Sequence, residues 1–243
     1  STPPVTWEGA ADVEKLIMIG TPNAGTLEAF IELVDGVRFV PILPKAKYEA
    51  ALLGTFPAYY QLLPPVRHKR VLIGEESDQK VLDLFDPEVW IDFNWGLASP
   101  EQADILKILL PDVQSAKRRR DIAVDHLRKC LRRAQRITRA LHVDEETPPG
   151  VSFHLFTGDS EKTDAFISVD PDNGDLTVLE EEAGDGIVLR SSALLDERLG
   201  GEWEPHLVSP IPWQSVMFIF SDHMGITEDP TFVDNILFYL LEY

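Results

Sequence analysis

Cysteine, basic side chains and long apolar runs are all scarce in this chain of 243 residues. Cys130 is the only cysteine, which excludes an intrachain disulfide and a cysteine-rich metal site. No apolar run reaches the about 20 residues that a membrane-spanning helix needs. Residues 1–4, Ser-Thr-Pro-Pro, also lack the basic and then apolar pattern of a signal peptide. We therefore expect no membrane span and no targeting segment, which favours the cytoplasm as the location.

The 22 Lys and Arg residues are outnumbered by 41 Asp and Glu residues, so the formal net charge is −19. Proteins that bind nucleic acids need a basic footprint for the phosphates, and this balance argues against that class. Half of the basic residues nevertheless lie within 107–142, together with only three acidic ones. Apolar residues recur in this segment at helical spacing, which predicts an amphipathic helix over 116–142. We prefer a solvated helix packed on an acidic body to a membrane-surface helix, because the segment has no bulky aromatic residue.

Three short apolar runs have the composition of buried strands. Residues 16–19, Leu-Ile-Met-Ile, run into the turn Gly-Thr-Pro-Asn-Ala-Gly at 20–25, as a parallel strand does at its carboxyl end. Residues 151–156 and 216–220 have a similar composition. We expect about three core strands, with the strand at 15–20 beside the strand at 151–156.

The remaining segments predict helices and irregular structure. Short helices are expected at 27–35 and 100–110, and a last helix at 230–241. Prolines and aromatic residues interleave from 37 to 96, which favours irregular excursions with short helices, a cap rather than a sheet.

Residues 165–169 and 176–179 predict a hairpin around Asp-Pro-Asp-Asn-Gly-Asp at 170–175, because the Asn-Gly step accommodates a positive φ. A calcium loop is the alternative for this segment. It is disfavoured because the acidic residues miss the spacing that such a loop requires.

Two short segments carry residues that could perform chemistry. Gly-Asp-Gly-Ile-Val at 184–188 is expected in a turn beyond the strand at 151–156, and Ser-Asp-His-Met-Gly at 221–225 follows the strand at 216–220. The carboxyl ends of parallel strands meet at one edge of a sheet, so Asp185 could orient His223 as a general base. An acid followed by a histidine is also the chain order of α/β-hydrolases.

Each of these two residues has a simpler explanation on its own. An Asp between glycines is often only a turn former, and a His after a strand often only satisfies a polar group. The shared strand context and the chain order favour the catalytic interpretation. The remaining histidines lack such a setting and are expected to be structural or solvent-facing: His68, His126, His142, His154 and His206.

Five segments, in this order, carry a family resemblance: the strand and Thr-Pro-x-x-Gly turn at 16–26, Leu-Leu-Pro within 60–64, Leu-Phe-Asp-Pro with two tryptophans at 84–96, the acid segment at 184–192 and Asp-His-Met-Gly-Ile at 222–226. Together they resemble the lipases and acyltransferases similar to lecithin:cholesterol acyltransferase, within the α/β-hydrolase superfamily. The resemblance implies that Asp185 and His223 are the catalytic acid and base. It also makes residues of the first and last motifs candidates for substrate contact, namely Thr21, Pro22, Asn23 and Met224.

The sequence departs from this family at the nucleophile. Gly-x-Ser-x-Gly, the strained turn that exposes the catalytic serine, occurs nowhere in the chain. In the family this turn precedes the Thr-Pro-x-x-Gly strand, so the nucleophile and its oxyanion hole are expected on a missing N-terminal segment. By itself the chain should therefore not hydrolyse esters by the mechanism of the family.

These observations predict an α/β fold: the C-terminal half of an α/β-hydrolase sheet with a large, mostly helical cap insertion. Residues 1–36 and 147–243 would form the core and residues 37–146 the cap, which would supply an acyl pocket. The expected function is a serine hydrolase or acyltransferase acting on a lipid-like acyl ester, with no cofactor and no metal ion. Its partner would be the N-terminal half of the same hydrolase as a second polypeptide. A catalytically inactive fragment or binding module of the same fold is the alternative, and a metal-dependent hydrolase is disfavoured because no His-x-x-x-His spacing occurs.

Overall fold

The computed structural model describes residues 6–38, 47–74, 78–143, 146–198 and 207–241. The chain divides into two compact units, each of which is described by itself. The first unit consists of residues 1–26, 140–165 and 178–243, and the second of residues 27–139 and 166–177. Compared with the division expected from the sequence, residues 27–36 and 166–177 belong to the second unit rather than to the core, and residues 140–146 belong to the first unit rather than to the cap.

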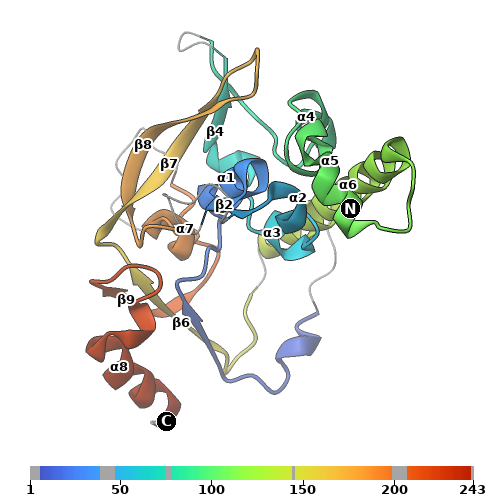
Figure 1. Ribbon diagram of the computed structural model, residues 1–243. Coiled ribbons are helices and arrows are strands. Elements are labelled where there is room, and N and C mark those ends of the chain that lie inside the picture. The colour runs from blue at the N-terminus through green and yellow to red at the C-terminus, as the bar shows by residue number, and fades with distance from the viewer. Residues whose placement is uncertain (1–5, 39–46, 75–77, 144–145, 199–206, 242–243) are drawn as a thin grey trace. The chain divides into compact units, whose positions relative to one another are not determined.

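A three-stranded parallel sheet forms the centre of the first unit (Figure 1). Its strands are β1 (Lys15–Ile19), β6 (Ser152–Gly158) and β9 (Trp213–Ile219), in the order β1-β6-β9. Leu16 lies opposite Phe153 in the register of β1 and β6, which confirms that these two strands are neighbours. The central strand β6 is buried over most of its length, as expected for its uninterrupted apolar sequence.

Helices of the first unit pack on both faces of this sheet, because successive side chains of a strand point to opposite sides. On one face, Leu155 packs with residues of the short helix α7 (Arg190–Leu194). On the other face, Phe156 packs against Phe232 of α8 (Pro230–Leu241), with the two ring centroids 5.1 Å apart. Two 3-10 turns, η1 (Glu8–Ala10) and η5 (Ile226–Glu228), complete the first unit.

The predicted hairpin is present and longer than expected. Its strands β7 (Glu161–Val169) and β8 (Leu176–Gly184) are joined by a turn in which the amide of Gly174, at φ +78°, donates to the Asp170 carbonyl. Asp185 therefore follows β8, and not directly the strand at 151–156 as the sequence suggested.

Four short strands also occur in the segment 37–96, which was expected to be irregular. In the second unit β4 (Val71–Ile73) pairs with β7 in parallel and with β5 (Lys80–Val81) in antiparallel. The prediction of irregular structure was wrong here, because a three-residue apolar run gives no periodicity. Elsewhere in this unit β2 (Val37–Arg38) pairs with β3 (Lys47–Tyr48).

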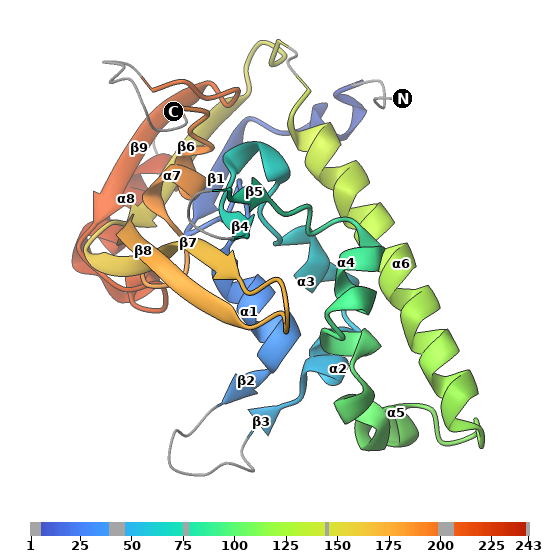
Figure 2. The ribbon, with the colours of Figure 1, turned by 90° about the horizontal axis from the view of Figure 1, so that it is seen from above.

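The rest of the second unit is built from short helices and one long helix. The longest is α6 (Ala116–Leu141), whose last two residues belong to the first unit, and it runs past α3 and α4 (Figure 2). The helices predicted near residues 27–35, 100–110 and 116–142 are confirmed. The shorter elements are α1 (Leu27–Asp35), α2 (Ala50–Leu53), α3 (Pro57–Gln61), η2 (Val66–His68), α4 (Pro87–Asp92), η3 (Gly96–Ala98), η4 (Pro100–Gln102) and α5 (Ala103–Leu109).

Aromatic residues hold the core of the second unit together. Trp90 is fully buried, and its ring meets Phe30 and Trp95 edge to face at centroid distances of 6.0 and 5.9 Å. The apolar face of α6, including Leu127 and Leu131, lies in the same core. Of the described helices, none is both long enough and apolar enough to cross a membrane.

Candidate active site

Asp185 is held in a fixed orientation at the end of β8. Its Oδ1 accepts hydrogen bonds from the backbone amides of Ile187 at 3.0 Å and Val188 at 2.7 Å, and its side chain is 0% exposed. Gly186, at φ +91°, completes the turn, and its amide donates to the Thr163 hydroxyl at 2.9 Å. The second oxygen, Oδ2, is left for another partner.

That partner is His223, which lies in the loop after β9. Nδ1 of His223 is 2.8 Å from Oδ2 of Asp185, so the predicted contact between the acid and the histidine is confirmed. The backbone amide of His223 also donates to the Asp185 carbonyl at 2.8 Å, which joins the two loops at a second point. The imidazole side chain keeps 29% of its surface exposed. Because Nδ1 faces the carboxylate, Nε2 is the ring nitrogen that remains for a substrate or a nucleophile.

Two glycines at strand ends make room for this pair. A Cβ on Gly20, which follows β1 at φ +55°, would lie 3.0 Å from Cε1 of His223. A Cβ on Gly158, the last residue of β6, would lie 2.7 Å from Cβ of Asp185 and would also clash with the Ser221 carbonyl. Neither glycine was selected as a site residue from the sequence. Their position at the carboxyl ends of apolar strands was the signal that could have identified them.

The electrostatic surroundings raise the pKa of His223 above its usual value of 6.5. The main cause is the hydrogen bond to Asp185, which burial of the ring opposes and the negative charges of Asp185 and Asp222 reinforce. The carboxylate therefore stabilises the protonated imidazole, as a general base requires when it accepts a proton.

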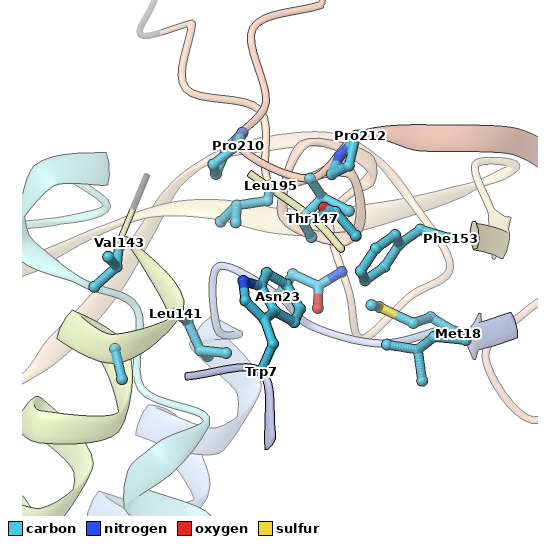
Figure 3. Close-up of a pocket in the computed structure, with 13 residues that line it drawn as sticks. Trp7, Met18, Asn23, Leu141, Val143, Thr147, Phe153, Leu195, Pro210 and Pro212 are labelled. Carbon is cyan, nitrogen blue, oxygen red and sulfur yellow. The ribbon is translucent and has the colours of Figure 1, made fainter. Parts of the chain in front are cut away.

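The four candidates for substrate contact lie in different surroundings. Thr21 and Pro22 form the turn after β1, where their carbonyls accept from the amides of Asn23 and Gly25. The amide group of Asn23 donates to the Ala193 carbonyl at 2.7 Å, and Asn23 lines an apolar cavity of about 270 Å³ with Trp7, Met18 and Phe153 among others (Figure 3). Met224 is 78% exposed beside His223. Met224 is thus an exposed residue that directly follows His223 in the chain, whereas Asn23 binds the backbone of α7.

In the part of the chain that the structure describes, no serine hydroxyl is hydrogen-bonded to Nε2 of His223. Ser192, from the acid segment, is buried and donates to the Gly25 carbonyl at 2.6 Å, which is a structural role. Within the same described residues, no three His, Cys, Asp or Glu side chains are grouped so that they could hold a metal ion.

The other histidines are engaged elsewhere. In β6, His154 is buried, with Nδ1 2.8 Å from the Ser215 hydroxyl and Nε2 3.0 Å from the Ser152 hydroxyl. His126 lies on α6 within 3.2 Å of the Thr55 carbonyl, and His142 lies 3.7 Å from Glu197. The side chain of His68 is buried, whereas His206 lies outside the described residues.

Comparison with known proteins adds no family to these observations. No family model matches the chain, and no curated protein matches its sequence.

Proposed function

We propose that the chain supplies the acid and the base of a serine hydrolase or acyltransferase of the α/β-hydrolase type. The observation that carries this proposal is the 2.8 Å contact between Nδ1 of His223 and a buried carboxylate, Asp185, that two backbone amides orient. A histidine held in this way presents Nε2 as a general base. The order of the residues along the chain, with the acid before the histidine, supports the same class.

In the proposed reaction, Nε2 of His223 accepts the proton of a serine hydroxyl while the serine oxygen attacks the acyl carbonyl carbon. The protonated imidazole then gives this proton to the departing alkoxide, and an acyl-serine remains. Water or a second alcohol, deprotonated by the same histidine, attacks the acyl group and releases the serine. Asp185 keeps the tautomer of the imidazole and stabilises its positive charge in both halves.

The serine must come from a segment outside this chain, because Gly-x-Ser-x-Gly is absent from the sequence. The sheet of the first unit offers a place for such a segment. In the described structure β1 is an outer strand, and Leu16 and Ile19 on it are 42% and 38% exposed. Parallel sheets are normally covered on both faces and continued at their edges, so a further strand beside β1 would bury these residues.

An acyl ester with an apolar chain is the substrate class that the surroundings of His223 favour. Phe220 and Met224, which flank the histidine in the sequence, are 87% and 78% exposed. In this proposal the two side chains belong to an apolar surface that contacts the acyl chain.

Active-site labelling tests the proposal. We expect a fluorophosphonate to label a second polypeptide that carries Gly-x-Ser-x-Gly and copurifies with this chain, as detected by intact mass spectrometry. His223→Ala and Asp185→Asn should abolish or strongly reduce the labelling. The control His142→Gln, directly after the end of α6, should leave the labelling unchanged.

Two results would contradict the proposal. One is a single unlabelled chain of 243 residues with no copurifying polypeptide, and the other is labelling that persists in His223→Ala. Either result would favour the alternative, a binding module of the same fold without catalysis.

A further inference from the structure

A stripe of six cations lies along the outer side of α6. It consists of Arg128, Lys129, Arg132, Arg133, Arg136 and Arg139, which we call the basic stripe. At about 100° of rotation per residue, the six side chains fall within an arc of roughly 140° over the last three turns of the helix. The core-facing residues Leu127, Leu131 and Ala134 lie on the opposite side and are buried. The orientation of the helix is therefore fixed by its core, and the stripe faces outward.

Few acidic side chains neutralise the basic stripe. Arg128 pairs with Glu88 at 2.8 Å, and Lys129 pairs with Asp125 one turn earlier on α6. Within the described residues, no ion pair is present for Arg132, Arg133, Arg136 or Arg139. Like charges three and four positions apart on a helix repel one another. The chain has a net charge of −19, yet among the residues that the structure describes no carboxylate lies within ion-pair distance of these four arginines.

The composition of the stripe limits the kind of partner that it fits. No aromatic or large aliphatic residue interrupts the six cations, so the stripe has no apolar side chain to insert into a lipid bilayer and no aromatic platform for the bases of a single nucleic-acid strand. It can contact a flat anionic surface through long side chains. The acidic remainder of the chain would be repelled by such a surface. That repulsion is screened over about 8 Å at physiological ionic strength, so the groups in direct contact decide the binding.

The sequence alone favours a solvated helix over a membrane-surface helix, but an outward face on which four arginines have no ion pair within the described residues favours contact with an anionic surface. We propose that the basic stripe of α6 docks the protein on an anionic lipid surface by adsorption, which needs no aromatic residue. This inference rests on the proposed function, because an apolar acyl ester is found in lipid aggregates and docking would bring the enzyme to it. Each Lys or Arg near an anionic membrane contributes about a five-fold increase in affinity. Six such residues are sufficient for reversible adsorption without insertion.

Sedimentation with lipid vesicles tests this inference. We expect the full chain to bind vesicles of phosphatidylcholine with about one-third phosphatidylserine, but not vesicles of phosphatidylcholine alone. The binding should disappear between about 50 and about 300 mM NaCl, because salt screens exposed charges. Arg132→Gln with Arg136→Gln should weaken binding about 25-fold, and glutamine keeps the helix propensity of arginine.

A matched control separates the position of the charges from their number. Lys107→Gln with Lys117→Gln removes the same two charges outside the stripe and should reduce binding much less. Equal losses in the two double variants would overturn the proposal, as would binding to neutral vesicles or no binding to anionic ones. Tighter binding to a DNA duplex than to anionic vesicles would also overturn it, by assigning the stripe to nucleic acid.

The vesicle experiment also distinguishes this inference from the proposed function. His223→Ala should bind vesicles as the unchanged protein does, because His223 belongs to a different unit from the stripe. If the protein binds vesicles but no fluorophosphonate labelling occurs, the docking inference stands and only the catalytic proposal is contradicted.

Discussion

At the scale of single residues, hydrogen bonds determine which atoms of Asp185 and His223 face each other and which remain available to other groups. Two amides occupy Oδ1 of Asp185, so only Oδ2 can face the imidazole. The carboxylate occupies Nδ1 of His223, so only Nε2 can take a proton from outside. A turn-forming Asp and a histidine that merely satisfies a polar group would not need this division of contacts.

Asp185→Asn should lower the pKa of His223, because the hydrogen bond to the carboxylate is the largest cause of its rise above 6.5. With that bond lost, burial of the ring, which lowers the pKa, is opposed only by the charge of Asp222. The titration of the Cε1 proton of His223 in NMR spectra measures the change. Asp222→Asn is the control and should shift the pKa less. A pKa that stays the same in Asp185→Asn would show that the pair is not formed in solution.

Gly158→Ala should destabilise the protein by roughly 1–3 kcal/mol, because the added methyl group would overlap Asp185 and the Ser221 carbonyl. Chemical denaturation measures the difference in the free energy of unfolding. Gly9→Ala is a suitable control in the same unit, since nothing lies within 4 Å of a Cβ at Gly9. Equal stability of the two variants would contradict the close approach of the acid loop to β6.

At the scale of elements, the sequence was sufficient where apolar residues filled most of a run of at least four residues or recurred at helical spacing. The apolar runs of β1, β6 and β9 and the periodic α6 were recognised because burial on two faces or on one helical face leaves a readable pattern. The Asp185–His223 pair was recognised because each residue lies in a short loop with a turn signature, and His223 follows β9, although Asp185 follows β8 and not one of these three strands.

The sequence was insufficient where the structure depends on pairing between distant segments. In the second unit β4 is a strand because it pairs with β7, nearly a hundred residues later, and its own three residues do not show this. The extension of β8 through 180–182, Glu-Glu-Glu, was also missed, because an exposed strand can be polar on both faces. The roles of Gly20 and Gly158 became clear only from the atoms packed against them.

Two residues of α5 test how the second unit is packed. Leu106→Ala should cost about 2–5 kcal/mol, because Leu106 is 5% exposed in the aromatic core, whereas Ile108→Ala should change stability by less than about 0.5 kcal/mol, because Ile108 is 73% exposed. Both changes shorten an aliphatic side chain in the same helix. Similar losses in the two variants would mean that α5 presents a different face to the core.

At the scale of the whole molecule, two histidines of the first unit make the free energy of unfolding depend on pH in opposite directions. Burial is the main cause that lowers the pKa of His154 below 6.5, with the charge of Lys15 adding to it, whereas the hydrogen bond to Asp185 raises the pKa of His223 above 6.5. The contribution of His154 is therefore fully present above pH 6.5 and is lost as the pH falls toward its folded pKa. The contribution of His223 is fully present below pH 6.5 and is lost as the pH rises through its folded pKa.

Thermal unfolding between about pH 5 and about pH 9 should separate these contributions in variants. Asp185→Asn should remove the part of the stability loss at alkaline pH that His223 causes. The difference in stability between this variant and the unchanged protein should therefore be largest below pH 6.5 and shrink above it. His154→Gln should remove part of the stability that the unchanged protein loses at acidic pH. The difference in stability between the unchanged protein and this variant should therefore be largest above pH 6.5 and shrink below it. If both differences changed with pH in the same direction, one of the two histidines would be paired differently in solution. Because each comparison subtracts the same background of other titrating groups, the slope of each difference belongs to one histidine and its direct partners.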